Sequence, residues 1–160
     1  MAIWVCRTGS KGEYETHMYS NRQIYLTRRG YDDDIKKSSK EMLTKITQEI
    51  HPDASRQTIS NIWSQIDIFA NRMSVGDIVL IPQKGKHKIS VARIISDYKF
   101  ESSADELFKH QRDIEVIKSG LDFSKFPRDI FYSLGAFRAI FSLKQEDRFI
   151  KLLNKIGINI

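Results

Sequence analysis

Residues 61–98 decide the fold, and they read NIWSQIDIFANRMSVGDIVLIPQKGKHKISVARIISDY. In and just before the first part of this stretch, apolar residues recur three or four positions apart, which places them on one face of a helix. These residues are Ile59, Ile62, Trp63, Ile66, Phe69, Ala70 and Met73. Gly76 then ends the helix, because glycine adopts the positive φ that a sharp stop requires.

A β-hairpin is predicted directly after this central helix. Residues 78–81 form a continuous apolar run, as expected for a strand buried on both faces. Pro82 is expected to end that strand, since proline cannot donate to the next rung of the ladder. Residues 83–86 predict a turn with a basic tip, and residues 88–95 predict the returning strand.

The rest of the chain predicts further short elements around this unit. Runs rich in β-branched and aromatic residues predict strands at residues 2–6, 23–27, 114–117 and 137–143. Ser38 and Glu41 form a capping box that starts a helix, residues 100–111 predict a polar loop, and residues 145–156 predict a C-terminal helix. Six strands and three helices without βαβ alternation favour an α+β fold, a mixed barrel decorated by helices.

Composition limits the class of protein. The 160 residues are 41% hydrophobic, which fits one domain with a sizeable core. The formal net charge of +6 favours a polyanionic partner. The single cysteine, Cys6, is expected to be buried and inert. Without an apolar run long enough for a bilayer or a signal-peptide pattern, we expect a cytoplasmic protein that has no membrane partner.

The spacings of common catalytic and metal centres are missing from the sequence. The four histidines are scattered, with no pair at the spacing of a zinc site. The run Asp32-Asp33-Asp34 lacks the alternating ligands of a calcium loop and favours a solvated acidic turn. Glu115 and Lys118 would face opposite sides of a strand, out of step with the Asp…Glu-x-Lys pattern of nucleases. We therefore expect no catalytic residue, no metal and no cofactor, and a protein that is not an enzyme.

Residues 7–12 leave two interpretations open. This segment follows the first strand and contains two glycines and two cations. Such a loop can hold an anion through its backbone amides, but the spacing is not that of a Walker loop, and a plain turn fits the same residues.

Six segments along the chain form a joint pattern. They are WVCRTG at 4–9, RRGY at 28–31, N-x-x-x-Q at 61–65, MSVGDIVLIP at 73–82, ARIISDY at 92–98 and YSLGAF at 132–137. Together they resemble the N-terminal domain of Mrr-like, modification-dependent (type IV) restriction proteins, which is similar to the EVE/YTH branch of the PUA-like fold. The resemblance implies a small PUA-like mixed β-barrel with about three helices over residues 1–144. Residues 145–160 would then form a helix that ends the domain or leads to an effector domain.

The resemblance also implies a function. Such domains bind DNA and recognise a methylated or hydroxymethylated base, flipped out of the duplex into an aromatic cleft, in restriction or phage defence. A flipped base needs a flat apolar wall and hydrogen-bonding groups for its polar edge. The alternatives are an RNA-binding PUA-like module for modified or structured RNA, and a domain that binds a small molecule or a protein. Modified double-stranded DNA is the expected partner, and a nuclease domain or subunit would supply any cleavage.

Two sets of residues are candidates for binding. The expected pocket lies between the exit of the first strand, the turn at residues 28–31, the start of the central helix and the loop after residue 98. Its candidate residues are Arg7, Thr8, Arg28, Tyr31, Asn61, Trp63, Gln65, Tyr98 and Ser133. The candidates for phosphate contacts are Lys84, Lys86, Lys88 and Arg128.

Each set has a plainer interpretation beside the functional one. Trp63 lies on the apolar helical face and would pack in the core, and the lysines would serve solubility. Related domains also often carry Trp-Asp-Gly where this chain has Arg28-Arg29-Gly30. An arginine can stack on a base, but it offers different hydrogen bonds.

Overall fold

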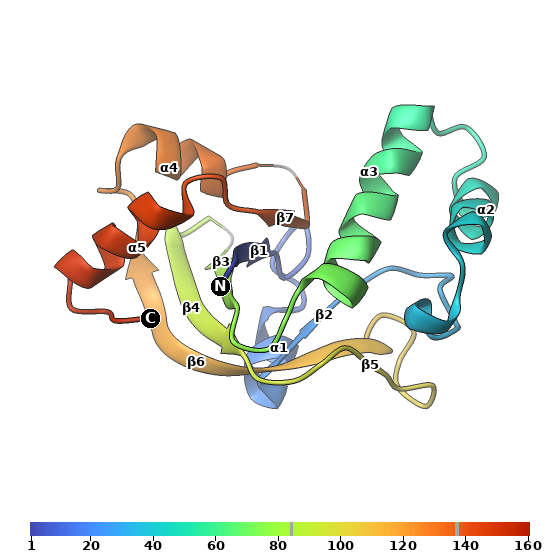
Figure 1. Ribbon diagram of the computed structural model, residues 1–160, viewed down its shortest axis with the longest axis horizontal. Coiled ribbons are helices and arrows are strands. Elements are labelled where there is room, and N and C mark those ends of the chain that lie inside the picture. Colours follow the sequence, from blue (N-terminus) through green and yellow to red (C-terminus); the bar gives the residue numbers. More distant parts are fainter. Residues whose placement is uncertain (84, 137) are drawn as a thin grey trace.

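The computed structural model of the protein describes residues 1–83, 85–136 and 138–160 (Figure 1). Within these residues the strands are β1 (Ile3–Cys6), β2 (Gln23–Tyr25), β3 (Ile78–Gln83), β4 (Lys88–Ile94), β5 (Lys99–Phe100), β6 (His110–Asp122) and β7 (Ile140–Ser142). The α-helices are α1 (Glu15–Asn21), α2 (Lys40–Ile50), α3 (Arg56–Asp67), α4 (Arg128–Leu134) and α5 (Glu146–Lys155). A 3₁₀ turn, η1 (Ile35–Lys37), precedes α2, and a π-helix, η2 (Ile68–Arg72), continues α3.

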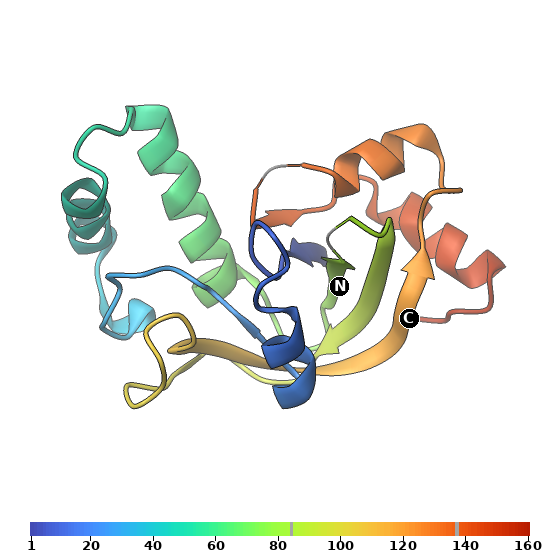
Figure 2. The same ribbon diagram turned by 180° about the vertical axis from the view of Figure 1, so that it is seen from behind.

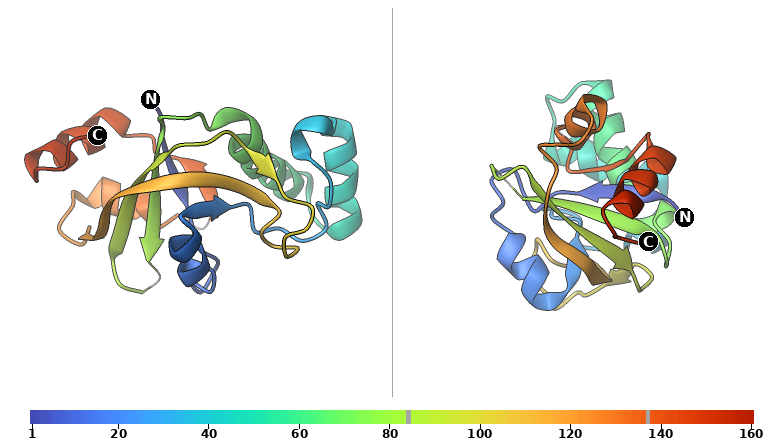
Figure 3. Two further views of the ribbon diagram at one scale, coloured as in Figure 1. Left: turned by 90° about the horizontal axis from the view of Figure 1, so that it is seen from below. Right: turned by 90° about the vertical axis from the view of Figure 1, so that its left-hand side faces the viewer.

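The strands form one mixed sheet that curls into a half-barrel (Figure 3). Their order is β2-β6-β4-β3-β1-β7, and β5 pairs with β6. β1 runs parallel to β3, whereas the other pairs of described strands are antiparallel. The prediction of an α+β domain with a mixed sheet is therefore confirmed.

A hydrophobic core lies on each face of this sheet. Val79 and Ile81 face a core that α3 and η2 complete, whereas Ile78 and Leu80 face a second core that α4 and α5 complete. Because both faces are covered, every position of residues 78–81 must be apolar, as the sequence indicated. Phe149 of α5 is fully buried in the second core, and burial of such a side chain contributes about 1.5–3 kcal/mol.

The parallel pairing of β1 and β3 sets where the site can form. The two strands pair through Val5 and Leu80, so their C-terminal ends leave the sheet at the same end. There the side chain of Gln83 donates to the carboxylate of Glu15 over 3.0 Å, which joins the hairpin to α1. The loop after Cys6 and the β3–β4 hairpin therefore lie close together.

One buried arginine holds the central helix against the sheet. Arg112 of β6 is almost fully buried. Its guanidinium donates to the carbonyls of Phe69 and Ala70 over 2.7 and 3.2 Å, and to the carbonyl of Ser96 over 3.2 Å. A π-helix leaves carbonyls without their usual α-helical partners, and Arg112 satisfies two carbonyls of η2.

Several predicted elements are confirmed. The central helix exists as α3 and η2, and Gly76 after it has a φ of +94°. The hairpin exists as β3 and β4, and the C-terminal helix exists as α5. Cys6 is buried.

Other predicted boundaries were wrong. β3 continues through Pro82, because β1 accompanies β3 only as far as Leu80 and a proline is tolerated on a free edge. Ser39 rather than Ser38 caps α2, with its Oγ accepting from the Met42 amide over 3.1 Å. Ser38 instead donates to the carbonyl of Asp34 over 2.9 Å.

Some elements were missed or misjudged in extent. β6 covers residues 110–122, so it includes part of the predicted polar loop. A half-buried strand usually alternates apolar inward and polar outward residues, but here the inward residues His110 and Arg112 are themselves polar. α1 and α4 have seven residues each, too few for a clear helical period. The last strand covers only Ile140–Ser142, and residue 137, where it was predicted to start, lies outside the described residues. No helix in the described part of the chain has the length and apolarity that a membrane crossing requires.

Candidate functional site

A polar pocket of about 270 Å³ opens where β1 and β2 leave the sheet. Its walls come from the exit of β1, residues 25–28, the third turn of α3 and residues 139–140. The polar residues that line it are Arg7, Ser10, Glu13, Tyr14, Tyr25, Thr27, Arg28 and Gln65. We call it the Arg7–Arg28 pocket.

Arg28 brings a charged, partly buried group to the pocket. Burial lowers the pKa of its guanidinium, although an arginine side chain in a protein stays charged at neutral pH. Its Nη2 donates to Oε1 of the buried Gln65 over 3.3 Å. A guanidinium has five N–H groups, so Arg28 retains donors for a ligand.

Arg7 is held from the other side of the pocket. Its Nη2 donates to the carbonyl of Leu134 over 3.0 Å and to the carbonyl of Ala136. Its Nε meets no acceptor among the described residues, and burial lowers the pKa of the guanidinium. The backbone of Arg7 also donates to the carbonyl of Ala139 over 2.8 Å. These contacts fasten the loop after β1 to the chain between α4 and β7 (Figure 2).

The contacts of Glu13 bear on whether residues 7–12 form a loop that holds an anion or a plain turn. Its carboxylate accepts from the backbone amide of Lys11 over 2.8 Å. Backbone hydrogen bonds from Glu13 itself and from Lys11 lower the pKa of this carboxyl. A Cβ at Gly9 would lie 2.5 Å from the same carboxylate. The loop therefore holds the carboxylate of Glu13 through a backbone amide, and this carboxylate lines the same pocket as Arg7 and Arg28.

Aromatic rings form one side of the pocket. Tyr14 and Tyr25 line it, and Phe108 packs on both rings, with centroids 5.8 and 4.9 Å away. His17 stacks on Phe108 at 3.8 Å. The cluster joins α1, β2 and the loop before β6, and two of its rings, Tyr14 and Tyr25, line the pocket.

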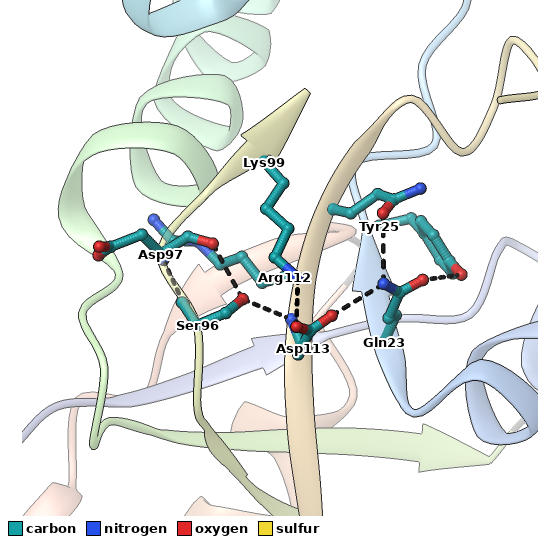
Figure 4. A network of polar contacts seen from close by, with 8 residues as sticks. Gln23, Tyr25, Ser96, Asp97, Lys99, Arg112 and Asp113 are labelled. Atoms are coloured by element: carbon teal, nitrogen blue, oxygen red, sulfur yellow. Dashed lines mark hydrogen bonds and ion pairs between the residues drawn. The ribbon is translucent and has the colours of Figure 1, made fainter. Parts of the chain in front are cut away.

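A polar network fixes the Tyr25 ring (Figure 4). The Tyr25 hydroxyl donates to Oε1 of Gln23 over 2.7 Å, and the Gln23 amide donates to Asp113 over 2.8 Å. Lys99 forms an ion pair with the same carboxylate. Partial burial opposes the charge of Asp113, but hydrogen bonds from Lys99 and Gln23 outweigh it and lower the pKa of the carboxyl.

Three predicted pocket residues meet in this pocket: Arg7, Arg28 and Gln65. Thr8 is buried beneath it, and its carbonyl accepts from the Tyr14 amide over 2.9 Å, so it shapes the loop. Asn61 lies outside the lining, where its Oδ1 accepts from Arg138 over 3.2 Å.

Tyr31 and Tyr98 are core residues rather than cleft residues. The Tyr31 hydroxyl lies 2.7 Å from Oγ1 of Thr47 inside the first core. Oη of Tyr98 accepts from the Ile35 amide over 3.1 Å and lies 2.7 Å from Nδ1 of His110. The Tyr31 hydroxyl finds its buried partner on α2, and the Tyr98 hydroxyl finds its partners on η1 and β6, as buried tyrosines usually require.

Trp63 and Ser133 lie in other places. Trp63 lines a groove between α2 and α3, on a different side of α3 from Gln65, since residues two apart on a helix do not face each other. Ser133 donates within α4 to the carbonyl of Asp129 over 2.8 Å and lines a separate hollow near β7.

The described candidates for phosphate contacts lie at the hairpin tip and at the start of α4. Lys86 and Lys88 are exposed there, and Lys88 lies opposite Asp122 in the register. Arg128 is exposed at the start of α4. The His87 carbonyl accepts from the Phe123 amide over 2.9 Å, which links the tip to the segment before α4. Lys84 lies outside the described residues.

Tyr14, Tyr25 and Phe108 are site residues that sequence reasoning missed. Tyr14 precedes α1, Tyr25 ends the three-residue β2 and Phe108 precedes β6, so the three rings are far apart in the sequence and no spacing connects them. Among the described residues, no group of three or more His, Cys, Asp or Glu side chains could hold a metal ion.

The fold and the pocket define an α+β domain with a curled mixed sheet and a small, cation-bearing pocket at one end. The chain belongs to a family described as a domain of unknown function (DUF8426), which matches residues 4–128. No curated protein and no solved structure matches the chain. The matched segment contains every wall of the Arg7–Arg28 pocket except residues 139–140.

Proposed function

We propose that this protein is a DNA-binding domain of PUA-like (EVE/YTH-type) architecture that recognises a methylated or hydroxymethylated base in a restriction or phage-defence system. The base would be rotated out of the duplex and bound in the Arg7–Arg28 pocket. The observation that carries the proposal is the joining of Arg28, Gln65 and Glu13 with the tyrosine wall in one small cavity.

The chemistry of the pocket suits the edge and face of a single base. An extruded base needs stacking on its face and hydrogen bonds to its polar edge. Tyr14 and Tyr25 offer ring faces or edges, Arg28 offers donors, and Glu13 offers an acceptor. Pockets for drug-sized ligands span about 300–1,000 Å³, and the volume here of about 270 Å³ fits a smaller group.

The charge distribution supports a nucleic-acid partner. The chain carries a formal net charge of +6, and Lys86 and Lys88 are exposed on the hairpin that contacts α1 near the pocket. Cations on this surface would contact phosphates on either side of the extruded nucleotide, which sets position and affinity but not sequence. Cleavage, where it follows recognition, would come from a separate nuclease domain or subunit.

A binding titration tests the proposal. Matched DNA duplexes without modification, with 5-methylcytosine, with 5-hydroxymethylcytosine and with N6-methyladenine are titrated at one salt concentration, beside RNA duplexes of the same sequence. We expect one modified DNA to bind at least about tenfold more tightly than unmodified DNA, since one good base contact contributes about 1–3 kcal/mol. Equal affinity for all the DNA duplexes would contradict base reading, and tighter binding of the RNA would favour the RNA alternative.

A further inference from the structure

A second concave site lies away from the Arg7–Arg28 pocket, between α2 and α3. It has a volume of about 500 Å³. The two helices stand side by side at one end of the molecule (Figure 1), and the side chains of both line the groove. We call it the α2–α3 groove.

The groove combines an aromatic face with cations. Trp63 is half-buried and forms its inner wall. Nζ of Lys40 lies 5.6 Å from the centroid of the Trp63 ring, near the limit of a cation–π contact. Arg56 and His51 lie on the rim. No Asp or Glu is among the described residues that line the groove, so its charge is of one sign.

Trp4, the other tryptophan, has a structural role and serves as a comparison for Trp63. Trp4 is buried, and its Nε1 donates to Oδ2 of Asp77 over 2.8 Å. Trp63 has no such partner for its indole N–H among the described residues, and it only borders the first core. A half-buried tryptophan that lines a basic groove is typical of stacking platforms for nucleic-acid bases.

We propose that the α2–α3 groove is a second nucleotide-binding site, in which Trp63 stacks against a base while Lys40 and Arg56 hold the adjoining phosphates. Lys40 would leave the ring face as the base arrives and move to the phosphate. The occupant is a single-stranded nucleic-acid segment, because an acidic peptide would satisfy the cations but leave the ring face without a planar partner. The proposal for this groove is independent of whether the Arg7–Arg28 pocket recognises a modified base.

Direct titration with short probes tests this proposal. The probes are fluorescently labelled pentathymidylate, unlabelled thymidine 5′-monophosphate, inorganic phosphate and polyglutamate. We expect pentathymidylate to quench the fluorescence of Trp63 while the buried Trp4 stays unaffected. Thymidine 5′-monophosphate is expected to compete better than inorganic phosphate, since only the nucleotide has a base to stack.

Variants assign the contacts. Trp63→Ala should weaken binding of labelled pentathymidylate by about 5- to 150-fold, the range for loss of one stacked base, and Trp63→Phe should restore part of it. Lys40→Gln and Arg56→Gln should each reduce the log–log salt slope by about 0.7. Lys45→Gln is the matched control, since Lys45 is exposed on α2 and does not line the groove.

The measurements separate loss of nucleotide contacts from loss of the folded structure. A thermal melt of each variant shows whether it is folded, and Trp63→Phe with the two charge variants keeps the test valid if Trp63→Ala is unstable. Unchanged affinity in Trp63→Phe together with unchanged salt slopes in Lys40→Gln and Arg56→Gln would overturn the proposal. Competition by polyglutamate as strong as that by pentathymidylate would also overturn it, in favour of an acidic protein partner.

Discussion

Arg28 illustrates, at the scale of the residue, why a charged group can serve recognition in this pocket. Burial removes water from its guanidinium, and a hydrogen bond made there is stronger than one made in bulk solvent. Its contact with Gln65 is long, at 3.3 Å, so a ligand can replace it at small cost. Arg29, the next residue, is exposed and pairs with Glu106 instead.

The chain of hydrogen bonds at His110 fixes the state of its ring. Nε2 lies 2.7 Å from the carbonyl of Tyr31, and a carbonyl only accepts, so Nε2 carries the proton. Nδ1 is then the acceptor for the Tyr98 hydroxyl, which itself accepts from the Ile35 amide. Every member of the chain is satisfied only while the imidazole is neutral.

A dependence of stability on pH follows from this arrangement. Burial lowers the pKa of His110 from its ordinary value of 6.5. The folded state therefore binds a proton less readily than the unfolded state. The contribution of the neutral ring is fully present above about pH 6.5 and is lost as the pH falls through the folded pKa. Asp34 and Asp32 act to raise the pKa and Lys109 to lower it, so burial decides the direction.

Urea unfolding of the wild type and of His110→Gln at pH 7.5 and pH 5.5 measures this contribution. We expect the wild type to lose more stability between the two pH values than the variant, by at most about 1.4 kcal/mol per pH unit. The same loss in both proteins would show that folding does not lower the pKa of His110. Because only the difference between pH values is compared, a constant destabilisation by the substitution does not affect the result.

At the scale of the element, the β3–β4 hairpin is the main candidate for phosphate contact. It is anchored near its tip by Gln83, which donates to Glu15, and by His87, which stacks on Phe123 with ring centroids 5.9 Å apart. Because the hairpin is held in place, it can present Lys86 and Lys88 to the phosphate backbone of DNA with little loss of conformational entropy on binding.

Replacing Lys86 and Lys88 together by glutamine should weaken binding to modified and unmodified duplexes by the same factor. The slope of log K against log salt should flatten by about 0.9 for each phosphate that a lysine no longer neutralises. Replacing Lys36 and Lys37 of η1, which are also exposed, is the charge-matched control. Salt slopes that stay unchanged in the hairpin variant would assign its lysines to solubility.

The elements that could be predicted from the sequence are those with a long pattern of apolar residues or with a glycine that marks their end. The apolar face of the central helix and the run at residues 78–81 indicated a helix followed by a buried strand, and the structure has both. The strand predicted at residues 114–117 lies within β6, but the start of β6 was predicted as loop. His110 and Arg112 point inward there, and only tertiary partners such as the Phe69 carbonyl make their burial possible. The seven-residue α1 carries no periodic signal of its own.

At the scale of the whole molecule, the curled sheet assembles the site. Arg7, Arg28 and Gln65 stand at the ends of three separate elements and meet because β1 and β2 leave the sheet near α3. Their meeting could be expected from the resemblance. The positions of Tyr31 and Tyr98 in the core could not be predicted from the sequence, since a tyrosine after a turn fits a cleft as well as a core. The buried partners Thr47 and His110 decide the matter.

Entry of a modified base into the Arg7–Arg28 pocket is the central step of the proposed function. The fluorescence of 2-aminopurine, placed beside the modified base, reports this step because the probe brightens when its neighbour unstacks. We expect the wild type and the control Arg29→Gln to raise the fluorescence on the modified duplex selected by titration, and Arg28→Gln to abolish most of the rise. Binding of the modified duplex by the wild type without any rise, or an equal rise with Arg28→Gln, would contradict base entry into this pocket.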